Sequence, residues 1–122
     1  MEVTDRVRAA VGEAGLREGA VMVYCPHTTA GVTIQENADP DVAHDLLLAL
    51  ENAVPVAATR GRYLHGEGNS DAHVKASLLG ASCLVPVAGG ELRLGTWQGI
   101  FLGEFDGPRL RGLELRFLGE AR

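Results

Sequence analysis

The chain has 122 residues, a formal net charge of −5 and 46% hydrophobic residues. This length suits one domain, residues 1–122, which can bury most of its apolar surface without disulfides or structural metals. The negative charge argues against nucleic acid and anionic membranes as partners, so a bound anion needs a local cluster of donors. No run approaches 18 apolar residues, the N-terminus lacks a signal pattern, and Cys25 and Cys83 lack CxxC spacing. These features predict a cytoplasmic protein with reduced thiols.

The first third of the chain predicts a helix, a strand, a polar loop and a second strand. Thr4 is typical of an N-cap and Gly15 of a helix stop. Residues 21–25 form an apolar run that is expected of a buried strand, and Pro26 ends it. His27, Thr28 and Thr29 follow as a polar loop, and residues 31–36 resume a β-like pattern.

Two further helices are predicted in the middle of the chain. Asp39 and Pro40 are typical of the cap and first position of a helix that Pro55 terminates. The expected apolar stripe of this helix consists of Val42, Ala43, Leu46, Leu47 and Leu50. A Gly-rich loop over residues 61–70 precedes a short helix over about residues 71–79, which Asn69 or Ser70 caps and Gly80 closes.

The remainder of the chain has a β pattern. We expect strands over residues 82–87, 91–105 and 110–118, with a tight hairpin turn at Gly89-Gly90 and another turn at residues 106–108. About three helices and six strands, mostly in hairpins, predict an α+β fold in which helices pack on an antiparallel-rich sheet or sandwich.

Three of the four histidines lie in polar, Gly- or Thr-rich surroundings. His65 precedes His73 by eight residues, on the loop that leads into the short helix, and His27 follows the first strand. This arrangement could close on one metal ion, although it matches no zinc-finger or zincin spacing, and scattered surface histidines remain the alternative. His44 is expected to be solvated. Three imidazoles suit zinc, whereas phosphate oxygens as ligands favour magnesium or manganese.

Other polar residues have both a functional and a structural interpretation. Arg109 and Arg111 are two residues apart, so on a strand they would share a face and could clamp a phosphate, or else form salt bridges with Glu104 or Glu91. Thr28 and Thr29 could donate hydrogen bonds to an anion. The carboxylates that could serve a site are Glu36 and Asp45, and solvent exposure is the alternative for Asp45.

Taken together, four segments resemble the YjbQ-type family, also called the secondary thiamine-phosphate synthase family. They are "HTTAGVTIQENADPDV", "YLHGEGNSDAHVKASLLG", "VPVAGGELRLGTWQGI" and "EFDGPRLRGLEL", within a resemblance that covers residues 3–120. Family members usually carry another strand before the segment that corresponds to Val3-Thr4-Asp5. An N-terminal edge strand is therefore expected to be missing here, or the start codon to be misassigned.

The resemblance implies a homotrimer with polar pockets near the subunit boundaries. It places His27, Glu36, Asp45, His65, Asn69, His73 and Arg109 at family motif positions. It favours a divalent metal held by His27, His65 and His73, with Glu36, Asp45 and His73 as catalytic groups and Thr28, Thr29, Asn69, Arg109 and Arg111 as ligand-binding groups. Trp97 is expected in the core or at a subunit interface.

The activity implied by the family name joins a pyrimidine pyrophosphate to a thiazole phosphate and releases pyrophosphate. Two alternatives stay open: a metal-dependent hydrolase or lyase of another phosphorylated small molecule, and a non-catalytic trimer that binds a metal or metabolite. Whether the chain is an enzyme is thus undecided by sequence, and a small phosphorylated metabolite is the expected partner.

Overall fold

The computed structural model describes residues 1–121. The elements in chain order are α1 (Thr4–Ala14), β1 (Leu16–Tyr24), β2 (Ala30–Glu36), α2 (Pro40–Ala53), α3 (Ser70–Leu79), β3 (Ser82–Ala88), β4 (Glu91–Leu92), β5 (Gln98–Glu104) and β6 (Glu114–Ala121). Three helices accompany two antiparallel sheets in this part of the chain, so the predicted α+β class is confirmed.

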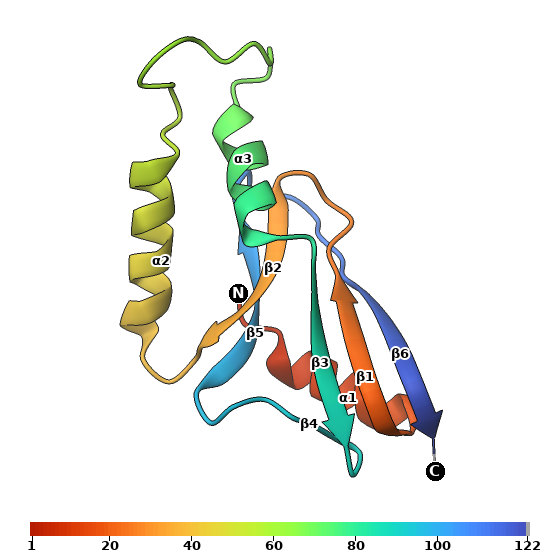
Figure 1. Cartoon of the computed structure of the whole chain (residues 1–122). Helices are drawn as coiled ribbons and strands as arrows, with labels where there is room; N and C mark the ends of the chain where they lie inside the picture. Colours follow the sequence, from red (N-terminus) through yellow and green to blue (C-terminus); the bar gives the residue numbers. More distant parts are fainter. Residues whose placement is uncertain (122) are drawn as a thin grey trace.

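The strands form a four-stranded sheet in the order β4-β3-β1-β6 and a separate pair, β2-β5. Figure 1 shows α1 lying behind the four-stranded sheet, α3 beside β2, and α2 at one edge of the molecule, where it faces β2. The long segment between α2 and α3 joins the ends of these two helices at the top of this view. Because Ala30 pairs with Glu104, the loop before β2 and the loop after β5 lie at the same end of this strand pair.

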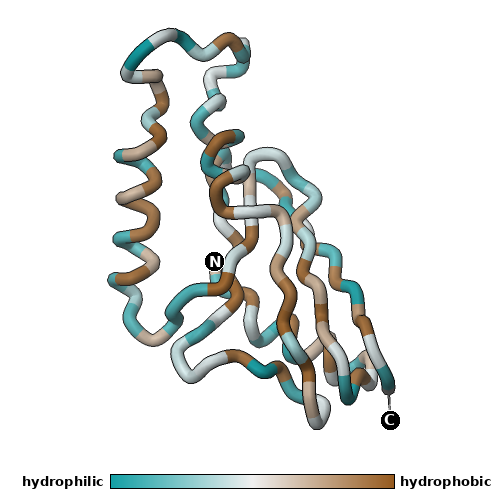
Figure 2. Tube along the Cα trace, in the orientation of Figure 1, coloured by the Kyte–Doolittle hydropathy of each residue, from teal (hydrophilic) through white to brown (hydrophobic). Residues whose placement is uncertain are grey.

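The hydrophobic core lies between α1 and the sheets. Its members are mainly aliphatic: Val3, Val7, Val11, Leu16, Val21, Val23, Cys25, Ala30, Val32, Val85, Val87, Ile100 and Leu102. Side chains alternate across a strand, so Val21 and Val23 of β1 point inward while Met22 and Tyr24 point to the other face. The hydrophobic colouring of Figure 2 follows β1 and β3 through this core.

Helix α1 matches its predicted range, but its cap differs from the prediction. Val3 occupies the N-cap position and Thr4 is already helical. The Thr4 hydroxyl accepts a hydrogen bond from the Ile100 amide at 2.8 Å and donates one to Glu2 at 2.7 Å. Thr4 therefore ties the helix to β5 rather than capping it, a long-range role that local sequence does not reveal. Gly15 ends the helix in the left-handed conformation, as expected.

Helix α2 begins as predicted but is far more exposed than predicted. The Asp39 side chain accepts a hydrogen bond from the Asp41 amide at 2.9 Å, and Pro40 is the first helical residue. No residue of this helix is buried, and Leu47 and Leu48 are 48% and 47% exposed. In Figure 2 hydrophobic and hydrophilic segments alternate along the helix, as expected of an apolar stripe on one side of it. The apolar stripe thus exists without a full partner inside one chain.

The C-terminal half departs from the predicted strands. The single strand expected over residues 91–105 is two strands, β4 and β5, which belong to different sheets. The alternation over residues 110–118 predicts a strand too early, because β6 begins at Glu114 and residues 105–113 form an ordered loop. Trp97 is 62% exposed and is not a core residue. Across residues 1–121, no helix has the length and apolar character needed to cross a membrane.

Candidate functional site

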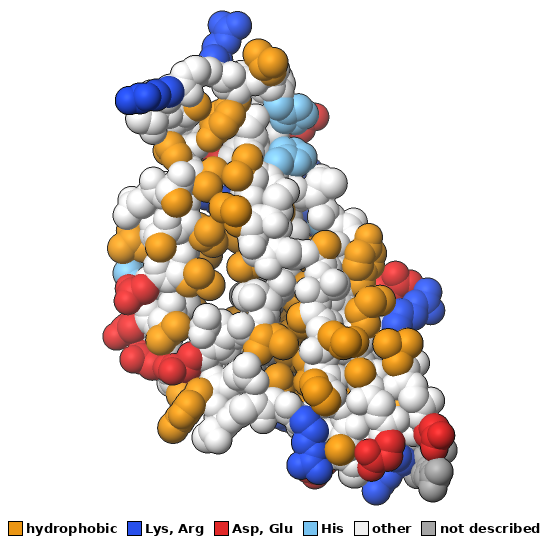
Figure 3. Space-filling view, viewed as in Figure 1, with side chains coloured by type: hydrophobic (Ala, Val, Ile, Leu, Met, Phe, Trp, Pro, Cys, Tyr) orange, Lys and Arg blue, Asp and Glu red, His pale blue; other side chains and the backbone are white. Residues whose placement is uncertain are grey.

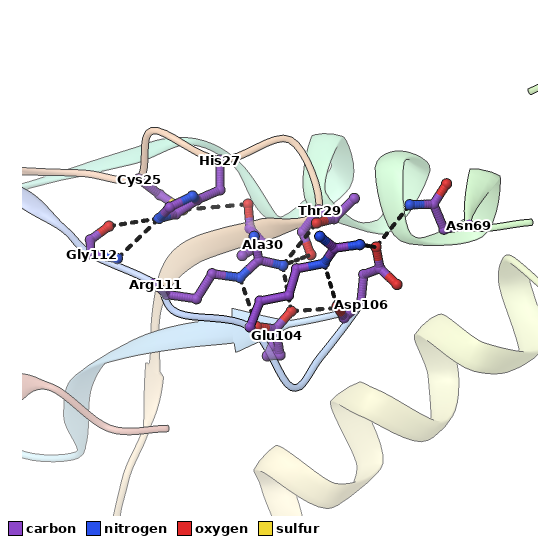
Figure 4. A network of polar contacts seen from close by, with 10 residues as sticks. Cys25, His27, Thr29, Ala30, Asn69, Glu104, Asp106, Arg111 and Gly112 are labelled. Carbon is purple, nitrogen blue, oxygen red and sulfur yellow. Dashed lines mark hydrogen bonds and ion pairs between the residues drawn. The ribbon is translucent and has the colours of Figure 1, made fainter. Parts of the chain in front are cut away.

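A network of polar contacts joins the β1–β2 loop, the end of β5 and the loop before β6 (Figure 4). The guanidinium of Arg111 lies at its centre, and the Arg111 side chain is only 10% exposed. The Arg111 Nε and Nη2 atoms donate to the two Glu104 carboxylate oxygens at 2.7 and 2.6 Å. Nη2 also donates to the Thr29 hydroxyl at 2.8 Å. This network anchors the 105–113 loop to the body of the protein.

The paired guanidinium shifts the acid–base properties of this network. Hydrogen bonds from Arg111 lower the pKa of Glu104 to about 2, and the same interaction raises the pKa of Arg111. Both groups stay charged across the physiological range, and they neutralise one another. Arg111 therefore forms the salt bridge with Glu104 that was the structural interpretation of this residue, and it is not a free clamp for an anion.

A second cluster surrounds Asp106 at the start of α3. The Asn69 amide nitrogen Nδ2 donates to Asp106 Oδ2 at 2.8 Å, and Arg109 Nη2 donates to the same oxygen at 2.9 Å. Arg109 Nε donates to the Asp106 carbonyl at 2.9 Å. The hydrogen bond from Asn69 makes the largest contribution to lowering the pKa of Asp106, and the bond from Arg109 lowers it further. Because residues 109 and 111 lie in a loop, the predicted shared strand face does not exist.

His27 lies in the first network, in the loop between β1 and β2. Its Nε2 atom is 3.0 Å from both the amide nitrogen and the carbonyl oxygen of Gly112. Depending on the tautomer, Nε2 accepts from the N–H or donates to the carbonyl. Thr28 follows in the same loop and is exposed to solvent. His27 thus holds the loop that contains Arg111.

His65 and His73 are the two histidines that the structure brings together. Their ring centroids are 5.2 Å apart and the rings meet edge to face, with an interplanar angle of 82°. His65 sits in the Gly-rich loop with Nε2 3.7 Å from a Glu67 carboxylate oxygen, and His73 lies on the first turns of α3. Figure 3 shows two adjacent histidine side chains at this end of the molecule.

The predicted three-histidine centre is not formed within one chain. Among residues 1–121 there is no group of three or more His, Cys, Asp or Glu side chains arranged to hold a metal ion. His65 and His73 meet, but the fold commits His27 to Gly112. His27 is held in the β1–β2 loop by Gly112, whereas His65 lies in the loop before α3 and His73 on the first turns of that helix.

The predicted catalytic carboxylates lie elsewhere. Asp45 is 75% exposed on α2, where it contacts the 73% exposed His44, and this pair is consistent with solvated groups. Glu36 ends β2 and lies half-buried in a narrow apolar gap between that strand and α2. Neither carboxylate joins the networks around Arg111 or Asp106.

An open hollow of about 290 Å³ adjoins His65. Its walls come from the segment between α2 and α3 and from the first residue of α3, and they include Arg62, Tyr63, Gly68 and Ser70. A helix N-terminus carries partial positive charge, which favours an anion. A cation, an imidazole and this helix end therefore line one small hollow.

Three polar features of the site were missed by sequence reasoning. Two of them depend on loop geometry, which no sequence pattern predicts: the contact of His27 with Gly112 and that of His65 with Glu67. Asp71 and Lys75 form a buried ion pair at 2.9 Å. Their i,i+4 spacing on a predicted helix was the signal that could have found it.

The fold and the site define a small α+β protein with a histidine pair at the start of a helix. A model of the family described as "UPF0047 protein YjbQ-like" matches residues 1–120, and the chain belongs to this family. It is similar to YugU of Bacillus subtilis, with 49% identity over 98% of this chain and 89% of that protein. It is also 44% identical to MJ1081 of Methanocaldococcus jannaschii, over 98% of this chain and 85% of that protein.

Solved structures agree with this assignment. An uncharacterised YjbQ/UPF0047 protein from Clostridium acetobutylicum matches with a TM-score of 0.91 and 50% identity, over 97% of this chain and 89% of that one. A protein of unknown function from Sulfolobus solfataricus matches with a TM-score of 0.90 and 32% identity, over 98% of this chain and 86% of that one. The family resemblance that the sequence motifs indicated is confirmed.

The activity implied by that resemblance requires correction. The family and these curated relatives carry only the uncharacterised designation UPF0047, and none of their descriptions names thiamine-phosphate synthesis or any transfer reaction. The prediction of a thiamine-phosphate synthase-like transferase is therefore wrong as a statement of function. The pairing of Arg111 with Glu104 also leaves that guanidinium neutralised where a pyrophosphate clamp was expected.

Proposed function

We propose that this protein binds a divalent transition-metal ion through His65 and His73, and that the ion helps to hold a small anionic metabolite in the adjoining hollow. The observation that carries the proposal is the separation of 5.2 Å between the two imidazole rings. Neutral imidazole is a common ligand for zinc and related ions.

The ring separation fits a shared ion. Zinc binds imidazole nitrogen at about 2.0–2.1 Å and prefers tetrahedral angles, so two imidazoles on one ion have ring centroids about 5 Å apart. Edge-to-face aromatic pairs have similar separations, and metal titration distinguishes the two cases. Two ligands leave coordination positions open, as a site that binds a ligand through its metal requires.

The surroundings favour an anion as that ligand. Arg62 lines the hollow with an exposed side chain, and Ser70 places the positive end of α3 beside it. A phosphate or carboxylate group could therefore contact the ion, the guanidinium and the helix end together. A small phosphorylated metabolite is the partner class that this combination fits best.

The first test is metal titration of the purified protein. We expect calorimetry with Zn²⁺ or Co²⁺ to show a specific site that His73→Ala weakens by more than about 10–100-fold, since loss of a direct ligand exceeds the effect of losing an outer-shell partner. His44→Ala is the matched control, because His44 is 73% exposed on α2. Equal metal affinity in wild type and His73→Ala would refute the proposal, and inorganic phosphate should then be tested for metal-independent binding.

We also propose that the chain assembles as a homotrimer through its uncovered apolar surfaces. Met22, Leu84 and Leu118 share the face of the four-stranded sheet opposite the core, and Leu84 and Leu118 are 59% and 53% exposed. Figure 3 shows hydrophobic side chains gathered over this face and between α2 and α3. Contiguous exposed apolar patches are typical of protein interfaces, and exposed Trp97 is a further candidate contact.

Light scattering tests the assembly. We expect a particle of about three times the 12.9 kDa chain mass, with an interface of more than about 2,000 Å² in total. Leu84→Glu together with Leu118→Glu should reduce the mass, because charges would be desolvated at the contact. Leu110→Glu is the control, since Leu110 is 99% exposed in a loop. A stable wild-type monomer at micromolar concentration would contradict the proposal.

A further inference from the structure

The side chain of Asn69 contains an unsatisfied polar atom inside the protein. Only 9% of Asn69 is exposed, and its Oδ1 oxygen is buried with no hydrogen-bond partner. It is the one buried side-chain nitrogen or oxygen in this condition among the described residues. A buried carbonyl oxygen without a partner is costly and is a sign of a missing ligand, ion or water. We infer that Asn69 Oδ1 is the third protein donor to the ion held by His65 and His73.

The position of Asn69 on α3 places it beside the histidine pair. Asn69 is the N-cap residue and His73 lies four residues later, so the two side chains are neighbours on the same flank of the helix. His73 in turn contacts His65. The start of α3 therefore holds His73, which meets His65, and the unpartnered oxygen of Asn69 one turn earlier.

The neighbours of Asn69 explain how its oxygen is aimed. An asparagine at the N-cap usually accepts a hydrogen bond from the first turn of its helix, but Asn69 makes no such bond. Instead its Nδ2 donates to Asp106 Oδ2 at 2.8 Å. Because a carboxylate accepts but does not donate, this bond fixes which end of the amide faces Asp106. Oδ1 is therefore directed away, and Figure 4 shows it on the far side from Asp106. Asp106 acts as a positioning residue for the donor.

The absence of accessible surface on Oδ1 is compatible with an ion. A water molecule needs about 2.8 Å between oxygen atoms, whereas a dehydrated zinc-sized ion approaches an oxygen ligand at about 2.0–2.2 Å. A bound ion therefore needs less room beside Oδ1 than a water molecule does. All three donors are neutral when the imidazoles are unprotonated, so the ion would keep its double positive charge. A doubly positive ion prefers an anion in its open coordination position. The role of Asn69 rests on the proposed function and extends it to the choice of an anionic ligand.

Cobalt(II) is the probe for this inference, because its visible absorption reports the number and type of ligands while titration gives affinity. We expect Asn69→Ala to weaken Co²⁺ binding by about tenfold or more and to change the spectrum as water replaces the amide oxygen. Asn69→Asp combined with Asp106→Asn reverses the hydrogen bond and supplies a charged oxygen. Arg109→Gln is added because Arg109 donates to the same Asp106 oxygen, and a glutamine oxygen can accept from the amide introduced at position 106. This triple variant should bind at least as tightly as wild type, and it keeps the test valid if Asn69→Ala folds poorly.

The outcomes distinguish the role of Asn69 from the proposed metal site of His65 and His73. Loss of Co²⁺ binding in His73→Ala, with wild-type affinity and spectrum in Asn69→Ala, would overturn the role of Asn69 and leave the histidine site intact. If His73→Ala also binds like wild type, the metal site itself fails. Thermal unfolding without metal provides the structural readout: a purely structural Asn69 would lower the melting temperature of Asn69→Ala without changing the cobalt spectrum.

Discussion

Replacement of Gly19 by alanine is expected to prevent stable folding of the four-stranded sheet. Gly19 of β1 faces Gly119 of β6, and both have positive φ angles, 149° and 127°. A Cβ atom on Gly19 would lie 1.9 Å from the carbonyl oxygen of Leu118 and 2.8 Å from the Cα atom of Gly119. The obstruction is backbone on a paired strand, so it cannot move away as a flexible side chain would. We expect a loss of more than about 4 kcal/mol, or no soluble protein.

The control for this experiment is a glycine without these constraints. Gly12 lies inside α1, and a Cβ atom there meets nothing within 4 Å. Gly12→Ala should therefore stabilise the protein by about 0.5–1 kcal/mol, because alanine favours the helix and restricts the unfolded chain. Urea denaturation monitored by circular dichroism compares the two variants. Equal stability of Gly19→Ala and wild type would show that the two strands can separate here at little cost.

The elements that the sequence predicted well are those defined by local chemistry. Asp39 and Pro40 mark the start of α2 because the cap and the first helical position act within one turn. The turn at Gly89-Gly90 is likewise local, and both glycines have positive φ. The exposure of Leu47 could not be predicted from the same stripe, because burial depends on what packs against the helix. An apolar stripe predicts that something packs against the helix, but it does not show whether that surface belongs to the same chain.

The strand errors arise from long-range pairing. Residues 91–105 read as one strand, but β4 pairs with β3 while β5 pairs with β2, so the chain must cross between sheets. Residues 110–113 alternate like a strand, yet Arg111 turns back to Glu104 and Thr29. That ion pair anchors an irregular loop, and its partners are 7 and 82 positions away in sequence. Periodicity alone contains no information about such contacts.

The candidate site was partly predictable for a related reason. His65 and His73 are joined by one short loop and one helix turn, so their proximity followed from local order. His27 was grouped with them through shared polar surroundings and through the family resemblance, and the fold places it against Gly112. The unsatisfied oxygen of Asn69 could not be foreseen at all, because it depends on where Asp106 arrives from a distant loop.

The buried ion pair between Asp71 and Lys75 gives the second large expected effect. Their side chains are only 11% and 9% exposed, and Lys75 Nζ donates to Asp71 Oδ2 at 2.9 Å. Lys75→Met keeps most of the aliphatic volume but leaves the carboxylate of Asp71 without its countercharge. We expect a loss of about 3–5 kcal/mol, because an uncompensated charge remains buried.

Two further variants decide whether charge is the cause of that loss. Lys75→Met combined with Asp71→Leu removes both charges and should recover most of the stability, since a buried ion pair contributes little over well-packed apolar residues. Arg8→Met breaks the Asp5–Arg8 pair on α1, whose side chains are 95% and 57% exposed, and should change stability by less than about 0.5 kcal/mol. Urea denaturation at neutral pH measures all three variants. If the double variant is no more stable than Lys75→Met, the loss comes from packing around α3 and not from the isolated carboxylate.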